Sequence, residues 1–345
     1  MAYISFQPKD YFNTVLYTGN NGAHSITGVG FRPDWIWLKP RNYADHHRLM
    51  DVVRGQYTIY SNRNVAQDAN SSHFTSFDSD GFTLAGSDGG WNSSSYNYVS
   101  WNWRAGNSQG SSNTDGSINT TYTSVNTTAG FSISQYTGTG SAATIGHGLG
   151  AAPDLVIIKS LQQTRIWIVG VEALGNWNKY LALSATDAEQ TSSTYFPSAP
   201  TSTVVNLGDG ANVNNSSENY IAYCFAEKKG FSKFGKYTGN GNGNGTFIYT
   251  GFKPAWVMVK RYDSGSEDWR ISDNKRFDQK NPIDKVLFAN LTNVESDADV
   301  YDFASNGFKL RTTDGGMNAS GGTYIYMAFA EEPLVASNGD PATAR

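Results

Sequence analysis

A lysine and a downstream carboxylate recur at nearly the same spacing in three places: Lys39 with Asp51, Lys159 with Glu172, and Lys260 with Asp273. In the first and third places an arginine follows the acid, as Arg54 and Arg276. Such pairs can perform acid–base chemistry when further groups converge on them. We find no such groups, and a lysine and an acid on neighbouring strands also pair across a sheet for purely structural reasons. We therefore expect structural Lys–acid pairs.

Histidines and clustered acids are the candidates for metal ligands. His46 and His47 are adjacent, so on a strand they point to opposite faces and cannot bind one metal ion together. His24 and His73 lie in the same third of the chain. Four acids could offer oxygens to Ca²⁺, but they lack the spacing of a dedicated loop: Asp263, Glu267, Asp268 and Asp273. We expect no metal and no cofactor.

The patterns typical of enzymes are missing. Glycosidases need two carboxylates facing one another across the scissile bond, and no expected strand carries such a pair on one face. Nucleophile elbows, phosphate loops and zinc spacings are equally absent, and the alternating Gly and Asn of residues 239–245 suit a hairpin tip better than a phosphate site. We predict no catalytic residues and a protein that is not an enzyme.

Aromatic side chains are the remaining candidates for ligand contact. They make up 14% of the chain, including 20 Tyr and 9 Trp. Most can be explained as cross-strand pairs inside sheets. Three tryptophans in polar surroundings are the ones we expect to be exposed and to stack on a glycan: Trp91, Trp177 and Trp269.

One order of residues occurs three times, and it organises the whole chain. Each copy has a Tyr-Thr-Gly motif, then a proline, then an apolar run ending in lysine, and finally an aromatic strand. The copies begin at Tyr17, Tyr136 and Tyr237, their prolines are Pro33, Pro153 and Pro254, and their last strands contain residues 98–103, 220–225 and 324–329. The copies are far longer than solenoid or propeller units.

Units of about 100 residues can each close their own core. We expect repeats at residues 1–104, 130–229 and 230–333, with a tail at 334–345. Residues 105–129 are rich in Gly, Ser, Asn and Thr, with Asp115 as the only charge. That composition predicts a flexible linker or a long exposed loop.

Short apolar runs separated by Gly-rich turns predict an all-β protein. Asp80-Gly81 and Asn306-Gly307 are hairpin signals, whereas the second copy has Val204–Leu207 at that place. We predict three tandem antiparallel β-sandwich domains. We favour a jelly-roll or lectin-like order over an immunoglobulin-like one, because the first and last strands of each copy are both strongly aromatic.

Charge and composition exclude several classes. The formal net charge is −4 and there is no basic cluster, which argues against nucleic acid and anionic membranes as partners. The single cysteine, Cys224, rules out a disulfide framework and suits a buried role. No signal peptide or transmembrane run is evident, so we expect a soluble protein made in a cytoplasm.

Several segments resemble repeats of virion proteins from tailed bacteriophages, especially marine ones: Met1 to Asn20, Gly28 to Asp34, Ser76 to Phe82, Ala222 to Glu227, and Gly251 to Trp256. Such proteins are described as tail-fibre or appendage-like structural proteins with concanavalin-like or lectin-like sandwiches. The resemblance covers nearly the whole chain outside the linker and the tail after Pro333. It brings no catalytic or binding residues with it.

The resemblance implies a non-enzymatic virion protein, a tail appendage or fibre-like component that assembles with other virion proteins and contacts host-surface glycans. One alternative is a decoration or head-fibre protein of the capsid, and another is a glycan-binding adhesin or a glycanase. Trimerisation is expected by analogy with short fibres alone. Because the repeated residues are those that build sandwiches, we expect function in the loops that differ, around His46, Trp177 and Asp268.

Overall fold

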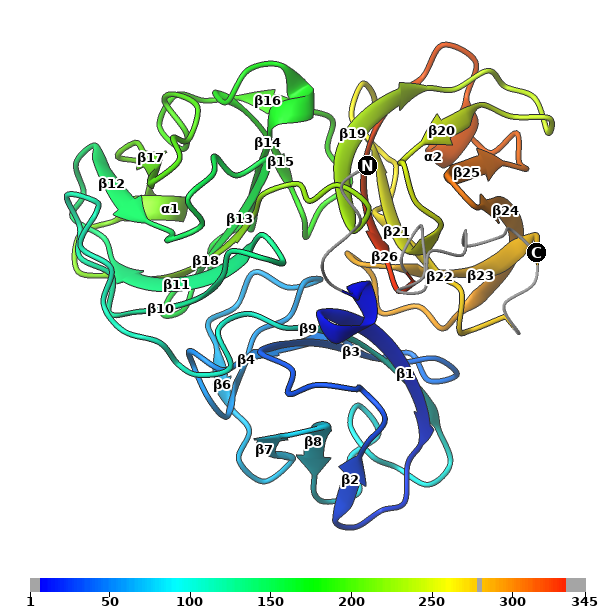
Figure 1. Cartoon of the computed structure of the whole chain (residues 1–345), viewed down its shortest axis with the longest axis horizontal. Coiled ribbons are helices and arrows are strands. Elements are labelled where there is room, and N and C mark those ends of the chain that lie inside the picture. The colour runs from blue at the N-terminus through cyan, green and yellow to red at the C-terminus, as the bar shows by residue number, and fades with distance from the viewer. Residues whose placement is uncertain (1–6, 278–280, 333–345) are drawn as a thin grey trace.

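The computed structural model describes residues 7–277 and 281–332, and these form three lobes around a common centre (Figure 1). The lobes correspond to the three sequence repeats, which we call repeats 1, 2 and 3. The prediction of an all-β protein is confirmed, since apart from short helical turns every regular element is a strand and every strand pair within the sheets is antiparallel. No helix in the described part of the chain has the length and apolar character needed to cross a membrane. The expected tail at 334–345 lies outside the described residues.

Repeat 1 follows a 3-10 turn, η1 (Pro8–Asp10), and contains two main sheets. The inner sheet has the order β1 (Phe12–Thr18), β9 (Asn97–Trp103), β3 (Trp35–Pro40) and β4 (Arg48–Asp51). The outer sheet has the order β2 (His24–Ile26), β8 (Gly81–Leu84) and β7 (Phe74–Asp78). A short pair, β5 (Tyr57–Thr58) and β6 (Asp68–Ala69), completes the repeat.

Repeat 2 has the same plan with additions at both edges. Its inner sheet runs β10 (Tyr122–Asn126), β11 (Phe131–Thr137), β18 (Asn219–Phe225), β13 (Leu155–Ser160), β14 (Ile168–Val171), β15 (Lys179–Ala182) and β16 (Gln190–Thr191). Its outer sheet is the pair β12 (Ala143–Gly146) and β17 (Val204–Leu207). Two short helical turns are η2 (Glu172–Leu174) and α1 (Ala211–Asn214).

Repeat 3 joins the corresponding strands into one eight-stranded, nearly closed, barrel-like sheet. Its order is β19 (Ser232–Thr238), β26 (Thr323–Ala330), β21 (Pro254–Arg261), β22 (Arg270–Asp273), β23 (Ile283–Phe288), β24 (Ser296–Ala304), β25 (Gly307–Leu310) and β20 (Phe247–Tyr249). One helical turn, α2 (Gly315–Asn318), precedes the last strand.

The last strand of each repeat lies between the first strand and the strand that follows the repeated proline. Strands β9, β18 and β26 therefore occupy equivalent central places, and the tyrosines stay in register as Tyr17 with Tyr98, Tyr136 with Tyr220 and Tyr237 with Tyr324. These central strands are buried along almost their whole length. That burial on both faces explains their continuous apolar and aromatic sequences.

The inner faces of the three repeats share one hydrophobic core. Aromatic side chains from all three meet there, including Trp35 and Trp103 of repeat 1, Tyr223 and Phe225 of repeat 2, and Phe329 of repeat 3. The Trp35 and Tyr223 rings stack at 4.7 Å, and the Phe12 and Phe329 rings at 5.4 Å. Each repeat also has its own outer core. The three repeats are therefore fused at the centre and form a ring.

The segment that we predicted to be a linker is hydrogen-bonded to repeat 2. Its residues 122–126 form β10, which pairs with β11 along the edge of the inner sheet. Upstream, the Ile118 N–H donates to the Thr144 carbonyl (2.9 Å) at the edge of β12, and the Ile118 side chain joins the outer core of repeat 2. This Gly-, Ser- and Thr-rich segment thus lies along the edge of the inner sheet and along β12 of the outer sheet, because small hydrogen-bonding residues can follow a strand closely.

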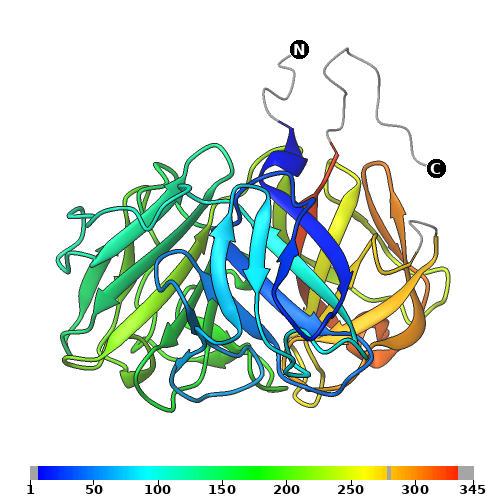
Figure 2. The same ribbon diagram turned by 90° about the horizontal axis from the view of Figure 1, so that it is seen from below.

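Both ends of the ring's chain lie on one side of it. Viewed from below, η1 and the end of β26 lie together at the same end of the molecule (Figure 2). Repeats 1 and 2, and repeats 2 and 3, are joined by the chain itself. Repeats 3 and 1 meet only through side-chain and backbone contacts.

Candidate functional site

The repeated tyrosines and glycines build the same turn in every repeat. The Tyr17 and Tyr98 rings stack at 4.8 Å, Tyr136 and Tyr220 at 5.4 Å, and Tyr237 and Tyr324 at 4.8 Å. In each pair the first phenol donates to a backbone carbonyl of the turn before the last strand, namely that of Trp91, Val213 or Met317. We call these three arrangements the turn clusters.

A buried asparagine completes each turn cluster: Asn92, Asn214 or Asn318. Its side-chain oxygen accepts from the backbone N–H that follows the Tyr-Thr-Gly motif, at 3.1, 2.8 and 2.9 Å. Its amide group donates to turn carbonyls, for Asn214 those of Ser141 and Gly208. The motif glycine is needed here, since a Cβ at Gly138 would lie 2.3 Å from the Asn215 carbonyl oxygen. The threefold motif is therefore a structural device, and this asparagine is a member of it that we had not singled out from the sequence.

Equivalent side chains lie at the three junctions between repeats. The Trp167 indole of repeat 2 donates to the Tyr60 carbonyl of repeat 1 (2.9 Å), and the Trp269 indole of repeat 3 donates to the Ala182 carbonyl of repeat 2 (2.9 Å). At the third junction the place is taken by His47 of repeat 1, beside the Phe288 backbone of repeat 3. Burial lowers the pKa of His47 well below its ordinary value, so its ring is neutral and accepts from the Trp37 indole (2.8 Å).

Two junctions contain a buried ionic triad. Asp51 binds Arg54 (2.6 Å) and accepts from the Tyr223 phenol of repeat 2 (2.7 Å). In the same way Asp273 binds Arg276 (2.6 Å) and accepts from the Trp101 indole of repeat 1 (2.9 Å). By strand register, the third set consists of three apolar residues of the shared core: Val171, Leu174 and Met327. One junction is therefore apolar where the other two are ionic.

The expectation that each repeated lysine pairs with an acid is wrong. The three lysines are fully buried, and their amines donate to backbone carbonyls, which for Lys39 and Lys260 include one from another repeat. Lys39 reaches the Thr292 carbonyl of repeat 3 (3.3 Å), and Lys260 reaches the Thr186 carbonyl of repeat 2 (2.9 Å). Lys159 donates to the Ser160 carbonyl (2.7 Å). The acids bind arginine or tryptophan instead. Asp51 and Asp273 each accept one side-chain N–H of an arginine, and Glu172 accepts from the Trp177 indole.

Burial shifts the pKa of several of these groups. It lowers the pKa of Lys39 and Lys159 to about 7 and that of Lys260 to about 8. It raises the pKa of Asp34 to about 6, although this carboxylate accepts from the Ala105 and Asn107 N–H groups at the start of the linker. These residues lie in structural contacts, so the shifts report desolvation and do not by themselves mark a catalytic centre.

The expectation that Trp91, Trp177 and Trp269 are exposed is wrong. Their relative exposures are 2%, 4% and 2%. The Arg48 guanidinium lies over the Trp91 ring (5.1 Å), and the Trp177 indole donates to Glu172 (2.6 Å). The Trp269 indole donates to the Ala182 carbonyl of repeat 2, so the polar sequence surroundings of these tryptophans did not indicate exposure. A stacking role would require an exposed ring face, which none of the three has.

The histidines and acids that could have held a metal are engaged separately. His46 contacts the Asn62 amide (2.8 Å) and His24 contacts Asn92 (2.8 Å). The four acids contact different partners: Asp263 with Arg261, Glu267 near Arg261 and Arg270, Asp268 with Asn290, and Asp273 with Arg276. Within the described ranges no three His, Cys, Asp or Glu side chains gather at one point.

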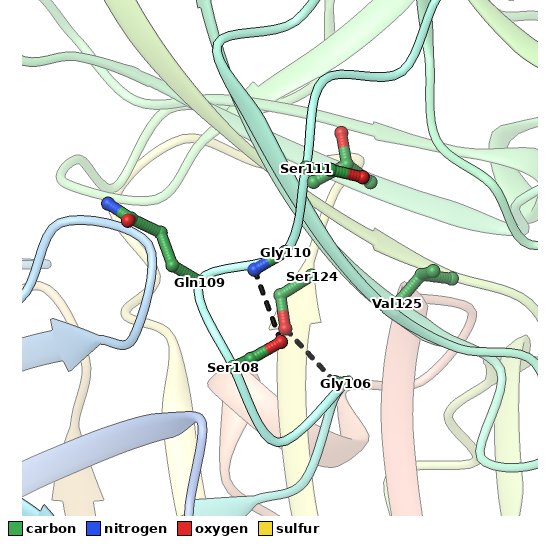
Figure 3. A pocket seen from close by; sticks show the side chains of 8 residues that line it. Gly106, Ser108, Gln109, Gly110, Ser111, Ser124 and Val125 are labelled. Atoms are coloured by element: carbon green, nitrogen blue, oxygen red, sulfur yellow. Dashed lines mark hydrogen bonds between the residues drawn. The ribbon is translucent and has the colours of Figure 1, made fainter.

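The linker forms an uncharged hollow of about 490 Å³ against β10. Figure 3 shows Ser108 and Ser124 beside one another, with the Gly106 N–H donating to the Ser124 hydroxyl (3.0 Å). The Gln109 side chain points away and donates to the Val53 carbonyl of repeat 1 (2.8 Å). The hollow thus offers hydroxyl and amide groups without charge.

A second hollow of about 430 Å³ lies at the junction of repeats 3 and 1. Its charges are already paired, Arg41 with Glu295 (2.9 Å) and Lys285 with Asp297. Asn42 and Asn97 add amide groups, and the next residues, Tyr43 and Tyr96, stack at 4.3 Å over Gly89. Both hollows lie where the repeats differ, and both suit a polar ligand held by hydrogen bonds.

The strand pairings, the shared core and the turn clusters define an all-β protein made of three related antiparallel repeats closed into a ring. A family model described as a domain of unknown function, DUF7483, matches residues 7–333. The chain therefore belongs to the DUF7483 family. Neither a curated protein nor a solved structure shows a significant match to it.

Proposed function

We propose that this protein is a non-enzymatic structural component of a tailed-phage virion, a tail appendage or fibre-like protein that contacts host-surface glycans. The observation that carries the proposal is the shared core, since three repeats fused at one centre make a rigid body without any disulfide. The repeated polar residues are engaged in turns and junctions, which leaves the differing loops for contacts. The sequence resemblance to virion proteins supplies the biological setting.

In this proposal each repeat is a lectin-like sandwich of the jelly-roll type, and the partners are other virion proteins. The protein is made in the host cytoplasm and ends on the particle. Trimerisation through the inner sheets would need faces that the three repeats already bury against one another. Any homo-oligomer would therefore use the outer surface of the ring.

The test is the location of the protein on the particle. Antibodies raised against the recombinant chain should label purified tailed particles from the source culture at the tail, as seen by immunogold electron microscopy. Label on the capsid would favour the alternative, a head decoration or head-fibre protein. A protein that is missing from purified particles, by mass spectrometry as well as by labelling, would overturn both versions.

A glycan-binding adhesin is the second candidate, and the two polar hollows favour it over a glycanase. They hold hydroxyl, amide and paired charged groups that can bind a sugar. Retained hydrolysis of a glycan by variants in which the exposed carboxylates are replaced would rule out carboxylate-based glycanase chemistry. If such a variant binds the glycan as before but no longer hydrolyses it, a carboxylate-based glycanase would be favoured.

A further inference from the structure

The short strand that follows the Tyr-Thr-Gly motif lies at the end of a sheet in each repeat, and the three copies differ in what this strand exposes. By register, Ser25 in β2, Thr144 in β12 and Phe247 in β20 are equivalent residues. The Ser25 hydroxyl contacts Thr83 (3.0 Å), and Thr144 exchanges hydrogen bonds with Ser117 of the linker (2.8 and 2.9 Å). In the first two repeats a small polar side chain at this position thus hydrogen-bonds to another side chain or backbone group of the protein.

Repeat 3 places aromatic rings at that position. Phe247 is 44% exposed and Tyr249, two residues further along β20, is 63% exposed. They are the most exposed large hydrophobic side chains among the described residues. Residues two apart on a strand point to the same face, so the two rings lie side by side on the outer surface of the sheet.

Gly307 allows the Phe247 ring to lie back against the protein, and the Tyr249 ring reaches back to Gly251. The tip of the Phe247 ring is 2.9 Å from the place where a Cβ at Gly307 would be, and the Tyr249 hydroxyl is 3.6 Å from that place at Gly251. Each ring therefore rests partly over backbone and exposes its other side to solvent. Exposed apolar area is unfavourable in water, and such a surface indicates a ligand or partner.

A free amine lies next to the rings. Lys309 is directly opposite Phe247 on β25, and Asp302 is opposite Lys309 on β24. Asp302 is bound by Arg311 (3.4 Å), and Lys309 forms no ion pair with any residue in the described ranges. The surface beside the rings is therefore left with an uncompensated positive charge.

We propose that Phe247, Tyr249 and Lys309 form a platform for an acidic glycan, in which sugar rings lie on the aromatic faces and a sugar carboxylate binds the Lys309 amine. The proposal rests on the proposed glycan contact and names its place and ligand class. The rings lie on the face of the sheet and not along its hydrogen-bonding edge, which suits a narrow ligand better than a partner's strand. Aromatic faces with a few placed polar groups are the usual composition of ligand sites.

The test uses uronic-acid oligosaccharides and the same oligosaccharides as methyl esters, with binding measured by calorimetry on the full-length protein. Phe247→Ala and Tyr249→Ala should each weaken binding of the acid by about tenfold or more. Lys309→Met should weaken binding of the acid and leave the weaker binding of the methyl ester unchanged. Tyr57→Ala is the matched control, since Tyr57, at 43%, is about as exposed as Phe247 but lies in β5 of repeat 1.

Unchanged melting temperatures would show that the variants are folded. The platform is overturned if the wild-type protein binds none of the acidic oligosaccharides, or if the aromatic variants bind them as well as it does. It is also overturned if the wild type self-associates in sedimentation experiments through these residues and binds no sugar. The location on the particle is a separate measurement, so a glycan-negative protein that is found on virions would remove only the platform.

Discussion

The Tyr223 phenol of repeat 2 donates a hydrogen bond to the Asp51 carboxylate of repeat 1 over 2.7 Å, and Arg54 binds the same carboxylate. This buried triad has an apolar counterpart in the same chain, where Val171, Leu174 and Met327 hold the equivalent places. The chain thus contains both solutions to one packing problem, one ionic and one apolar. An ionic triad in a core needs all of its members, whereas an apolar set needs only the right shape.

The first prediction concerns replacement of the ionic triad by the apolar residues that hold the equivalent places. Arg54→Leu alone should destabilise the protein by about 3–5 kcal/mol, because Asp51 then remains charged and buried without its main partner. The triple variant Asp51→Val, Arg54→Leu and Tyr223→Met should recover most of that loss. Chemical denaturation measures both, and a triple variant as unstable as the single one would contradict the equivalence of the junctions.

The second prediction concerns the turn clusters. Gly138→Ala should destabilise repeat 2 strongly, since its Cβ would meet the Asn215 carbonyl oxygen at 2.3 Å. Gly243→Ala is the control, because nothing lies within 4 Å of its Cβ. Asn214→Ala should cost about 1–3 kcal/mol through the turn groups left unbonded. Equal melting temperatures for the two glycine variants would contradict this role.

The third prediction is a pH dependence centred on Lys159, whose pKa is lowered by burial to about 7 from 10.5. Between these values the unfolded chain binds a proton that the folded protein does not, so the Lys159 contribution makes stability rise with pH. Relative to Lys159→Met, the wild type should gain stability from pH 7 towards pH 10 with a slope of up to about 1.4 kcal/mol per pH unit. Parallel stability curves for the two proteins would refute a lowered pKa.

The fourth prediction is that repeat 1 does not fold alone. The fragment 7–104 would expose the inner-face rings of Trp35, Trp37, Trp101 and Trp103, which the other repeats cover. We expect dye binding typical of exposed apolar surface and no cooperative thermal transition. A sharp calorimetric transition for this fragment would show that the shared core is dispensable.

The sequence was sufficient for some of this architecture and not for the rest. Short apolar runs and turn signals predict the all-β class, which the structure confirms. The repeated proline, Lys–acid pair and aromatic last strand are interpreted as scaffold, and of these the Lys–acid pair is wrong. The predicted Lys–acid pairing is wrong because other repeats supply the partners. Repeat 3 supplies a carbonyl to the Lys39 amine and repeat 2 supplies a phenol to the Asp51 carboxylate, which the spacing of the two residues cannot show. Trp269 was mistaken for a surface residue for the same reason, since the carbonyl that binds its indole is in repeat 2.

The sequence alone also does not show which aromatic side chains are exposed. Phe247 and Tyr249 alternate with the buried Ile248, which is the ordinary pattern of a strand with one wet face. Only the comparison with Ser25 and Thr144, through the strand register, shows that large rings here replace small polar groups. Register depends on contacts between distant segments, and one sequence does not contain that information.

The ring closes between its first and third repeats without a covalent link, so a force that separates these two repeats acts on non-covalent contacts alone. The contacts at this junction include the Lys39 amine on the Thr292 carbonyl, the Ser61 hydroxyl on the Ala289 carbonyl (2.6 Å), and Arg41 on Glu295. Opening of the ring therefore requires these contacts to break, while the covalent connections from repeat 1 to repeat 2 and from repeat 2 to repeat 3 stay intact.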